Sequence, residues 1–119
     1  MARRAAVVMA EDNFEHFENA IRLGVVQEVA RAVNATRNRA RQIIIRDDAI
    51  ITGDLWRSIT VELTAAGTHG EVYSPLEYAS YVHDGTEYME ARPFLTEAIR
   101  DITPEAQLRL ARILEGVSR

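Results

Sequence analysis

The chain has 119 residues, a formal net charge of −4 and no cysteine. Its length fits a single domain over residues 1–119, and the lack of cysteine excludes disulfides, a thiolate nucleophile and a Cys-based zinc site. We expect an intracellular protein without a membrane span, since the apolar run near the start is too short for one.

The first half of the chain predicts one extended segment and one long helix. Residues 1–10 hold a short apolar run, which fits an extended arm or a short strand. From about Asp12 a helical period begins and continues to Arg46, with Asp12 or Asn13 as the N-cap. Gly24 weakens the middle, so one helix with a soft point and two shorter helices both fit. The apolar positions are Phe14, Phe17, Ile21, Val25, Val29, Val33, Ala40 and Ile44.

A small antiparallel sheet is predicted next. Thr52 and Gly53 form a turn before a single helical turn through Leu55 and Trp56. Residues 58–65 then alternate apolar and polar side chains, which is typical of a half-buried strand. Residues 66–70 supply a hairpin turn, and the returning strand begins at Glu71 and stops at Pro75. Residues 76–82 fit either a third strand or a short helical turn.

The C-terminal part predicts helices. Pro93 suits the first position of a helix that runs to about Ile102. Thr103 followed by Pro104 predicts the N-cap of a second helix. The last helix has an apolar face made of Leu110, Ile113, Leu114 and Val117. The fold class is therefore α+β, with a long N-terminal helix, a small antiparallel meander and a C-terminal helical segment.

One cluster invites an enzymatic interpretation, namely His83 and Asp84 beside Ser80, Tyr81 and Glu87. A catalytic triad needs a nucleophile on a strained turn, and no such elbow is present. A metal site at His83 and Glu87 lacks a third ligand at suitable spacing. We expect a structural histidine, no cofactor and no enzyme activity.

Five arginines and no acid occur between Glu28 and Asp47. The simplest interpretation is a solvated helix end whose cations complement the helix dipole. A second is head-to-tail assembly, in which this basic end meets the acidic end of the next copy. A third is contact with phosphate groups. The arginines are Arg31, Arg37, Arg39, Arg41 and Arg46.

Four tyrosines lie near the 78–94 stretch, which is more than a small core requires. Trp56 is expected in the core. A tyrosine ring with a polar tip favours an interface, so we expect Tyr78, Tyr81 and Tyr88 among the contact residues. Arg31, Arg37 and Arg41 complete the predicted interface.

Two segments together resemble the neck and tail-completion proteins of long-tailed bacteriophages. The first is "ITGDLWRSITVEL" and the second is "YASYVHDGTEYMEARPFLTEAI". They match a pattern of T-G-x-L-x-x-S-I before a strand, then Y-A-x-x-V, G-T and A-x-P-F-L. The matching residues are Thr52, Gly53, Leu55, Ser58, Ile59, Tyr78, Ala79, Val82, Gly85, Thr86, Ala91, Pro93, Phe94 and Leu95.

The resemblance implies a structural virion protein that forms a homo-oligomeric ring at the head–tail junction. Its partners would be a head-completion or connector ring and the tail terminator or tail tube proteins, with genomic DNA passing through the ring. It would reside in the host cytoplasm during assembly. The alternatives are a tail terminator ring protein and a small nucleic-acid-binding regulator that uses the arginine-rich helix.

A DNA conduit must not hold DNA tightly, because phosphate contacts accumulate along the duplex. We therefore expect acidic side chains to face the channel. Most arginines between residues 31 and 46 are then expected to pair across subunit contacts.

Overall fold

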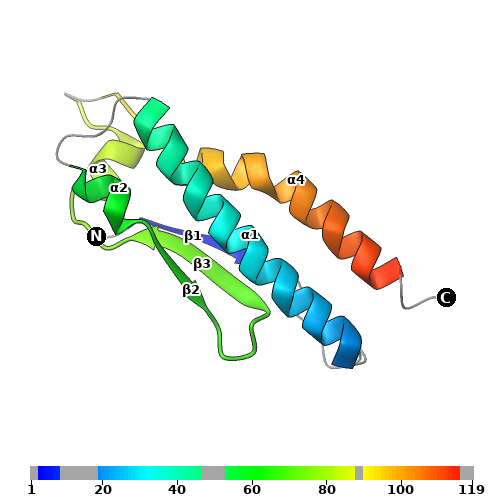
Figure 1. Cartoon of the computed structure of the whole chain (residues 1–119). Coiled ribbons are helices and arrows are strands. Elements are labelled where there is room, and N and C mark those ends of the chain that lie inside the picture. The colour runs from blue at the N-terminus through cyan, green and yellow to red at the C-terminus, as the bar shows by residue number, and fades with distance from the viewer. Residues whose placement is uncertain (1–2, 9–18, 47–52, 88–89, 116–119) are drawn as a thin grey trace.

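The computed structural model describes residues 3–8, 19–46, 53–87 and 90–115 (Figure 1). Two helices lie side by side on one face of a three-stranded sheet, and two short helices cover one end. The elements are β1 (Arg3–Val8), α1 (Asn19–Arg46), α2 (Asp54–Ser58), β2 (Thr60–Leu63), β3 (His69–Ser74), α3 (Ala79–Asp84) and α4 (Phe94–Glu115). The α+β architecture expected from the sequence is confirmed.

The sheet is antiparallel with the order β1-β3-β2, so the N-terminal segment supplies its third strand. Of the two predictions for residues 1–10, the strand is correct. Of those for residues 76–82, the helical turn is correct, because α3 occupies this segment. In β3, Gly70, Val72 and Ser74 are buried, while the alternate residues are partly exposed. The helices therefore cover one face of the sheet only.

Helix α1 is continuous over 28 residues. The predicted positions Val25, Val29, Val33, Ala40 and Ile44 are all fully buried. The expected start near Asp12, with Phe14 and Phe17, lies outside the described residues. Gly24 does not break the helix. It lies where α4 comes close, since a Cβ at this position would be 3.1 Å from Ile113 Cγ2.

Helix α4 corrects the prediction of two C-terminal helices. It runs unbroken from Phe94 to Glu115 with Pro104 inside it. Thr103 does not cap a new helix, because its hydroxyl donates to the Ile99 carbonyl at 2.7 Å, one turn back. Buried Ala98 and Ala106 fix the helix on both sides of the proline. Tertiary packing therefore outweighs the local Thr-Pro stop signal.

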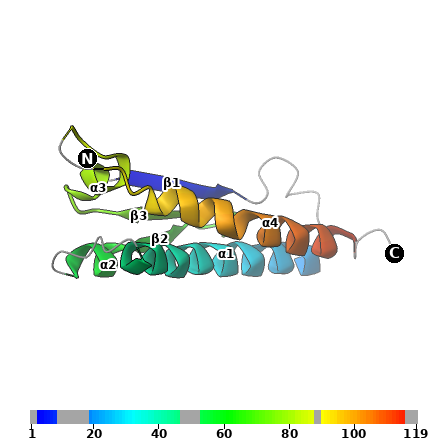
Figure 2. The same cartoon turned by 90° about the horizontal axis from the view of Figure 1, so that it is seen from above.

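The two long helices are antiparallel, and no described helix combines the length and apolar character that crossing a membrane requires. The molecule measures 55 × 23 × 22 Å along its principal axes. Figure 2 shows the helix pair running along the long axis, with the sheet on one side. The fold is an elongated two-layer unit.

The closest approach between sheet and helix occurs at Gly70. A Cβ there would collide with Val33 Cγ1 of α1. We expect Gly70→Ala to lower the free energy of unfolding by about 1–3 kcal/mol, because overpacking forces the layers apart. Urea denaturation followed by circular dichroism measures this change.

Gly24→Ala is the matched control, since the half-buried Ile113 side chain can yield there. Helix propensity favours alanine, so the net change should stay within about 1 kcal/mol. Equal stability of Gly70→Ala and wild type would contradict the close approach of α1 and β3.

Pro104 supplies the second prediction from the fold. It is exposed and has no backbone N–H to donate to the Arg100 carbonyl. Pro104→Ala restores this hydrogen bond, and we expect the free energy of unfolding to rise by about 1–3 kcal/mol. Thermal and urea denaturation measure it. A loss of stability would instead mean that the proline bend is needed to fit α4 onto α1.

Candidate interaction surface

The first motif segment, residues 52–59, builds a tight corner between α1 and β2. Gly53 precedes α2 with φ 84°, a left-handed conformation that favours glycine. Leu55 is 1% exposed and belongs to the core. The Ser58 hydroxyl donates to the Leu55 carbonyl at 2.6 Å and lies 2.6 Å from Ser74 Oγ. Thr52 lies outside the described residues.

The second motif segment joins α3 to α4. Gly85 ends α3 with φ 78°, and its N–H donates to the Tyr81 carbonyl at 2.9 Å. Thr86 follows as an exposed residue. The Pro93 carbonyl accepts the Glu97 N–H at 2.9 Å, so Pro93 is the residue before the first helical position rather than that position itself. Phe94 is 1% exposed and anchors the helix in the core.

His83 joins the same junction. It is 2% exposed, and its Nδ1 lies 2.8 Å from Asp84 Oδ1. The Thr96 N–H donates to Nε2 at 3.4 Å, so Nε2 is the acceptor and Nδ1 carries the proton toward the carboxylate. The ring also meets Phe94 edge-on, with centroids 5.2 Å apart. These contacts fasten α3 to the first turn of α4.

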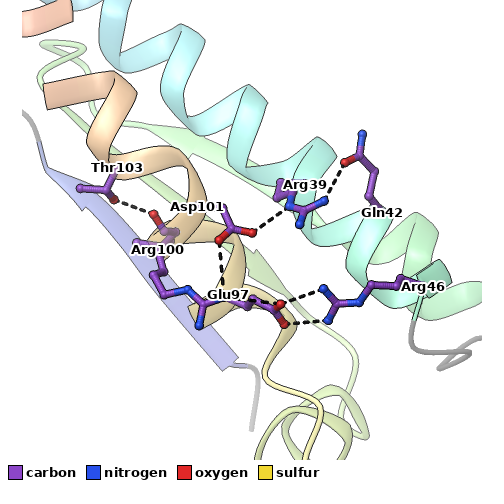
Figure 3. Close-up of polar contacts among 8 residues, drawn as sticks. Arg39, Gln42, Arg46, Glu97, Arg100, Asp101 and Thr103 are labelled. Atoms are coloured by element: carbon purple, nitrogen blue, oxygen red, sulfur yellow. Dashed lines mark hydrogen bonds and ion pairs between the residues drawn. The ribbon is translucent and has the colours of Figure 1, made fainter. Parts of the chain in front are cut away.

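Arginines of α1 face acids of α4, and we call the six residues named below the arginine–acid seam. Figure 3 shows the part of the seam in which Arg39 and Arg46 meet Asp101 and Glu97. Arg39 Nε donates to Asp101 Oδ2 at 2.9 Å. Arg46 donates from both terminal nitrogens to Glu97, at 2.8 and 2.9 Å. The seam comprises Arg31, Arg39 and Arg46 with Glu97, Asp101 and Glu105.

Arg31 reaches the seam from an ion pair inside α1. It donates to Glu28 one turn away, with Nη2 at 2.6 Å from Oε1. Glu28 is 6% exposed, so the pair keeps a buried carboxylate hydrogen-bonded. Glu28, and secondarily Glu105, raise the pKa of Arg31 against the effect of burial. Arg31, which the sequence placed at a subunit interface, is thus engaged inside its own chain.

Arg41 and Trp56 define a second basic feature, where α1 meets α2. Arg41 Nε donates to the Trp56 carbonyl at 3.1 Å, and Nη2 approaches the Ile59 carbonyl at 3.4 Å. Its guanidinium carbon lies 4.8 Å from the centre of the Trp56 ring, which gives a cation–π contact. Burial, and then the charge of Arg37, lower the pKa of Arg41.

Two N–H groups here lack partners among the described residues. Arg37 Nε and Trp56 Nε1 are both buried without a hydrogen bond. We call Arg37, Arg41 and Trp56 the basic corner. An unsatisfied buried donor costs about 1–3 kcal/mol, so two of them in one feature call for a physical explanation.

The tyrosines predicted at the interface differ in how exposed they are. Tyr81 is 54% exposed on α3 and is available for contact. Tyr78 is half-buried and packs against the core. Tyr88 lies outside the described residues. Arg31, Arg39, Arg41 and Arg46 have partners within the chain. The expectation that most arginines of residues 31–46 pair between subunits stays a prediction.

The sequence reasoning missed the acidic half of the seam. Glu97, Asp101 and Glu105 recur at every fourth residue, and the α1 arginines recur at intervals of eight and seven. Residues four apart share one helix face, so this spacing was the available signal. It could be used only after the two helices were known to be antiparallel neighbours.

The uncovered face of the sheet carries polar groups on β2 and β3. Glu62 and Glu71 are directly opposite each other in the ladder. Glu62 accepts a hydrogen bond from the Tyr73 hydroxyl at 2.7 Å, and Glu71 lies 3.6 Å from His69 Nε2. A shallow hollow lined by Glu62, Leu63, Thr64, His69 and Glu71 lies over the hairpin.

No group of three metal-ligating side chains occurs in the part of the chain that the structure describes. Comparison with known proteins finds no matching family model, curated protein or solved structure.

The ion pairs of two α4 acids, Asp101 with Arg39 and Glu105 with Arg109, predict a specific loss of stability in acid. The hydrogen bond from Arg39 lowers the pKa of Asp101 below its ordinary value of 3.8, and that from Arg109 lowers the pKa of Glu105 below 4.5. A lowered folded-state pKa contributes stability at higher pH, and this stability is lost as the pH falls through the folded value. The loss should begin below about pH 5.

We therefore expect Asp101→Asn with Glu105→Gln to be less stable than wild type at pH 7, with a difference that shrinks toward pH 3. Urea denaturation at both values measures it. Glu77→Gln with Glu90→Gln is the control with the same charge change, since neither carboxylate has a partner among the described residues. An equal effect of both double variants would show that total charge, rather than these two ion pairs, sets the acid sensitivity.

Proposed function

We propose that this chain is a structural virion protein of a tailed bacteriophage, a ring subunit at the head–tail junction. The main support is that residues of the two motif segments pack together in the core. Leu55, Val82 and Phe94 are at most 4% exposed and share one core cluster. Gly53 and Gly85 provide the backbone turns around it. The residues on which the resemblance to the neck and tail-completion proteins rests are therefore core and turn positions of this chain, which supports the proposal.

The surface supports a role in assembly. Large apolar side chains are exposed on several elements, and such side chains mark protein contacts where they form a contiguous patch. The exposed fractions are 59% for Leu23, 56% for Leu108, 55% for Ile45, 54% for Tyr81 and 45% for Leu63. An elongated subunit with exposed apolar groups on both layers suits packing against several neighbours.

The arginine series speaks against a regulator that grips nucleic acid. Four of its five members have partners within the chain, and three of these partners are carboxylates. An arginine already paired with a carboxylate gains less from phosphate contact. The acidic net charge of −4 acts in the same direction.

A DNA channel also requires a wall that repels phosphate, and the uncovered sheet face fits that role. Glu62 and Glu71 place two carboxylates opposite each other on it. Like charges directly across a ladder cost stability, a cost that the contacts of Glu62 with Tyr73 and of Glu71 with His69 offset in part. We propose that this face lines the channel.

The test uses tailed particles from cells that carry this gene. We expect the chain to be present in a fixed number of copies per particle, measured by mass spectrometry, and electron microscopy to locate it between head and tail. Cells that lack the gene should accumulate unjoined heads and finished tails, and the wild-type gene should restore joining.

Three other outcomes have distinct meanings. Tails of uncontrolled length would assign the chain to the tail terminator ring. Absence from purified particles would overturn the virion role. Salt-dependent binding of a labelled duplex by the purified chain, together with that absence, would favour the nucleic-acid-binding regulator.

A further inference from the structure

Charged groups without partners are few in the described residues, and they are not evenly distributed. Among the arginines of α1 in the 31–46 run, Arg37 makes no hydrogen bond or ion pair to another described residue. Among the described acids, Glu77, Glu87 and Glu90 make none with their carboxylates, and all three are exposed. The three acids lie in one segment, residues 77–92, which we call the acidic connector.

The basic corner is unbalanced within one copy of the chain. Arg37 lies one helical turn before Arg41, and like charges at this spacing repel. The nearby Asp54 is bonded to Arg57 at 3.3 Å. Arg37 Nε and Trp56 Nε1 are buried donors without acceptors. A carboxylate from another molecule that binds the terminal nitrogens of Arg37 would balance the positive charge and hold the guanidinium in its position.

The acidic connector has complementary properties. Residues 77–92 contain four acids and one arginine. One of the acids, Asp84, bonds to His83, which leaves the other three directed to solvent. Tyr81 is 54% exposed beside them. An exposed aromatic ring bordered by carboxylates is suited to a corner made of two guanidiniums and an indole.

The two surfaces lie at the same end of the molecule and on opposite sides. Figure 2 shows α2 beside α1 on one side and α3 with β1 on the other. One copy therefore cannot bring its connector to its own basic corner. Two different surfaces on opposite sides make a heterologous contact, and repetition of such a contact closes a ring or extends a chain.

We propose that the acidic connector of one copy docks on the basic corner of the next copy. The contact pairs Glu77, Glu87 and Glu90 with Arg37 and Arg41, and places Tyr81 against α2. This inference rests on the proposed ring function and names its subunit contact. A carboxylate is favoured over phosphate, because the chain itself carries the matching unpaired acids.

Charge exchange tests the contact. Arg37→Glu reverses the charge at position 37 and cancels the net charge of the corner, and Glu77→Arg with Glu87→Arg reverses the connector. Each variant alone should self-associate at least tenfold more weakly than wild type, roughly the loss expected for a mismatched charged contact. A one-to-one mixture should recover association, because the unchanged connector then meets the unchanged corner, and the reversed connector meets the carboxylate at position 37. Sedimentation equilibrium up to the highest soluble concentration measures this association. Ring closure is not used as the readout, because a ring with an odd number of subunits cannot alternate two variants.

Arg112→Glu is the matched control, an exposed arginine on α4 with no partner among the described residues. It should leave association unchanged. Circular dichroism and the fluorescence of the single tryptophan check folding, and Arg37→Gln replaces Arg37→Glu if the latter does not fold. A milder but clear weakening is expected from Arg37→Gln.

Several results would overturn the inference. These are a wild-type chain that stays monomeric, variants that associate normally, a mixture that does not recover, and an equal effect of Arg112→Glu. Loss of duplex binding by Arg37→Glu without any change in association would assign the corner to nucleic acid instead. Particle incorporation of an Arg37→Glu chain at normal levels would defeat this contact while leaving the virion role intact. If the wild-type chain is absent from particles but the variants and their mixture associate as expected, the virion role would be overturned and the contact would stand.

Discussion

Helix α1 must bury two faces at once, one on the sheet and one against α4, and the rest of the fold depends on this constraint. Val25, Val29 and Ile44 have no exposed surface. Each buried side chain of this size contributes about 1.5–3 kcal/mol. Small residues make room at both faces, because Gly70 of β3 lies against Val33 of α1 and Gly24 of α1 itself faces Ile113 of α4. The polar Thr36 is admitted because its hydroxyl donates to the Ala32 carbonyl at 2.8 Å.

The parts of the fold that were predictable have strong local signals. The helical period of α1 gave its buried positions, and the alternation after Ser58 gave the hairpin of β2 and β3. The motif glycines at 53 and 85 have positive φ angles, as tight turns require. In each case the physical reason lies within a few residues of the signal, so one sequence is sufficient.

The parts that were not predictable depend on distant partners. Nothing in residues 3–8 specifies that they pair with β3, on the edge of β3 that β2 does not occupy. The Thr103–Pro104 pair has the local pattern of a helix start, yet packing of Ala98 and Ala106 continues the helix through it. Gly24 reads locally as a weak point, and its role in admitting Ile113 appears only in three dimensions. Local propensities are small in comparison with burial, which explains these differences.

The candidate surface shows the same division. Sequence alone identified the arginine run and the tyrosines, but it could not divide them into paired and unpaired groups. That division depends on α4, which brings Asp101 and Glu97 to Arg39 and Arg46 (Figure 3). Exposed ion pairs of this kind contribute about 0–1 kcal/mol each, so the seam orients the helices more than it stabilises them.

The unpaired groups have a different consequence. A fold selected only for its own stability gains by satisfying buried donors, and one of the two at the basic corner could be removed by a single substitution of Trp56. A subunit that must recognise its neighbour has the opposite requirement, because an unbalanced charge in the free chain becomes balanced only on correct docking. Because the carboxylates of the acidic connector lie on the other side of the molecule from the basic corner, the proposed contact between copies has a direction. In the proposed assembly, the seam limits the number of wrong pairings, because it gives most of these arginines a partner within the chain. Arg37, which has no partner among the described residues, would set the register between copies.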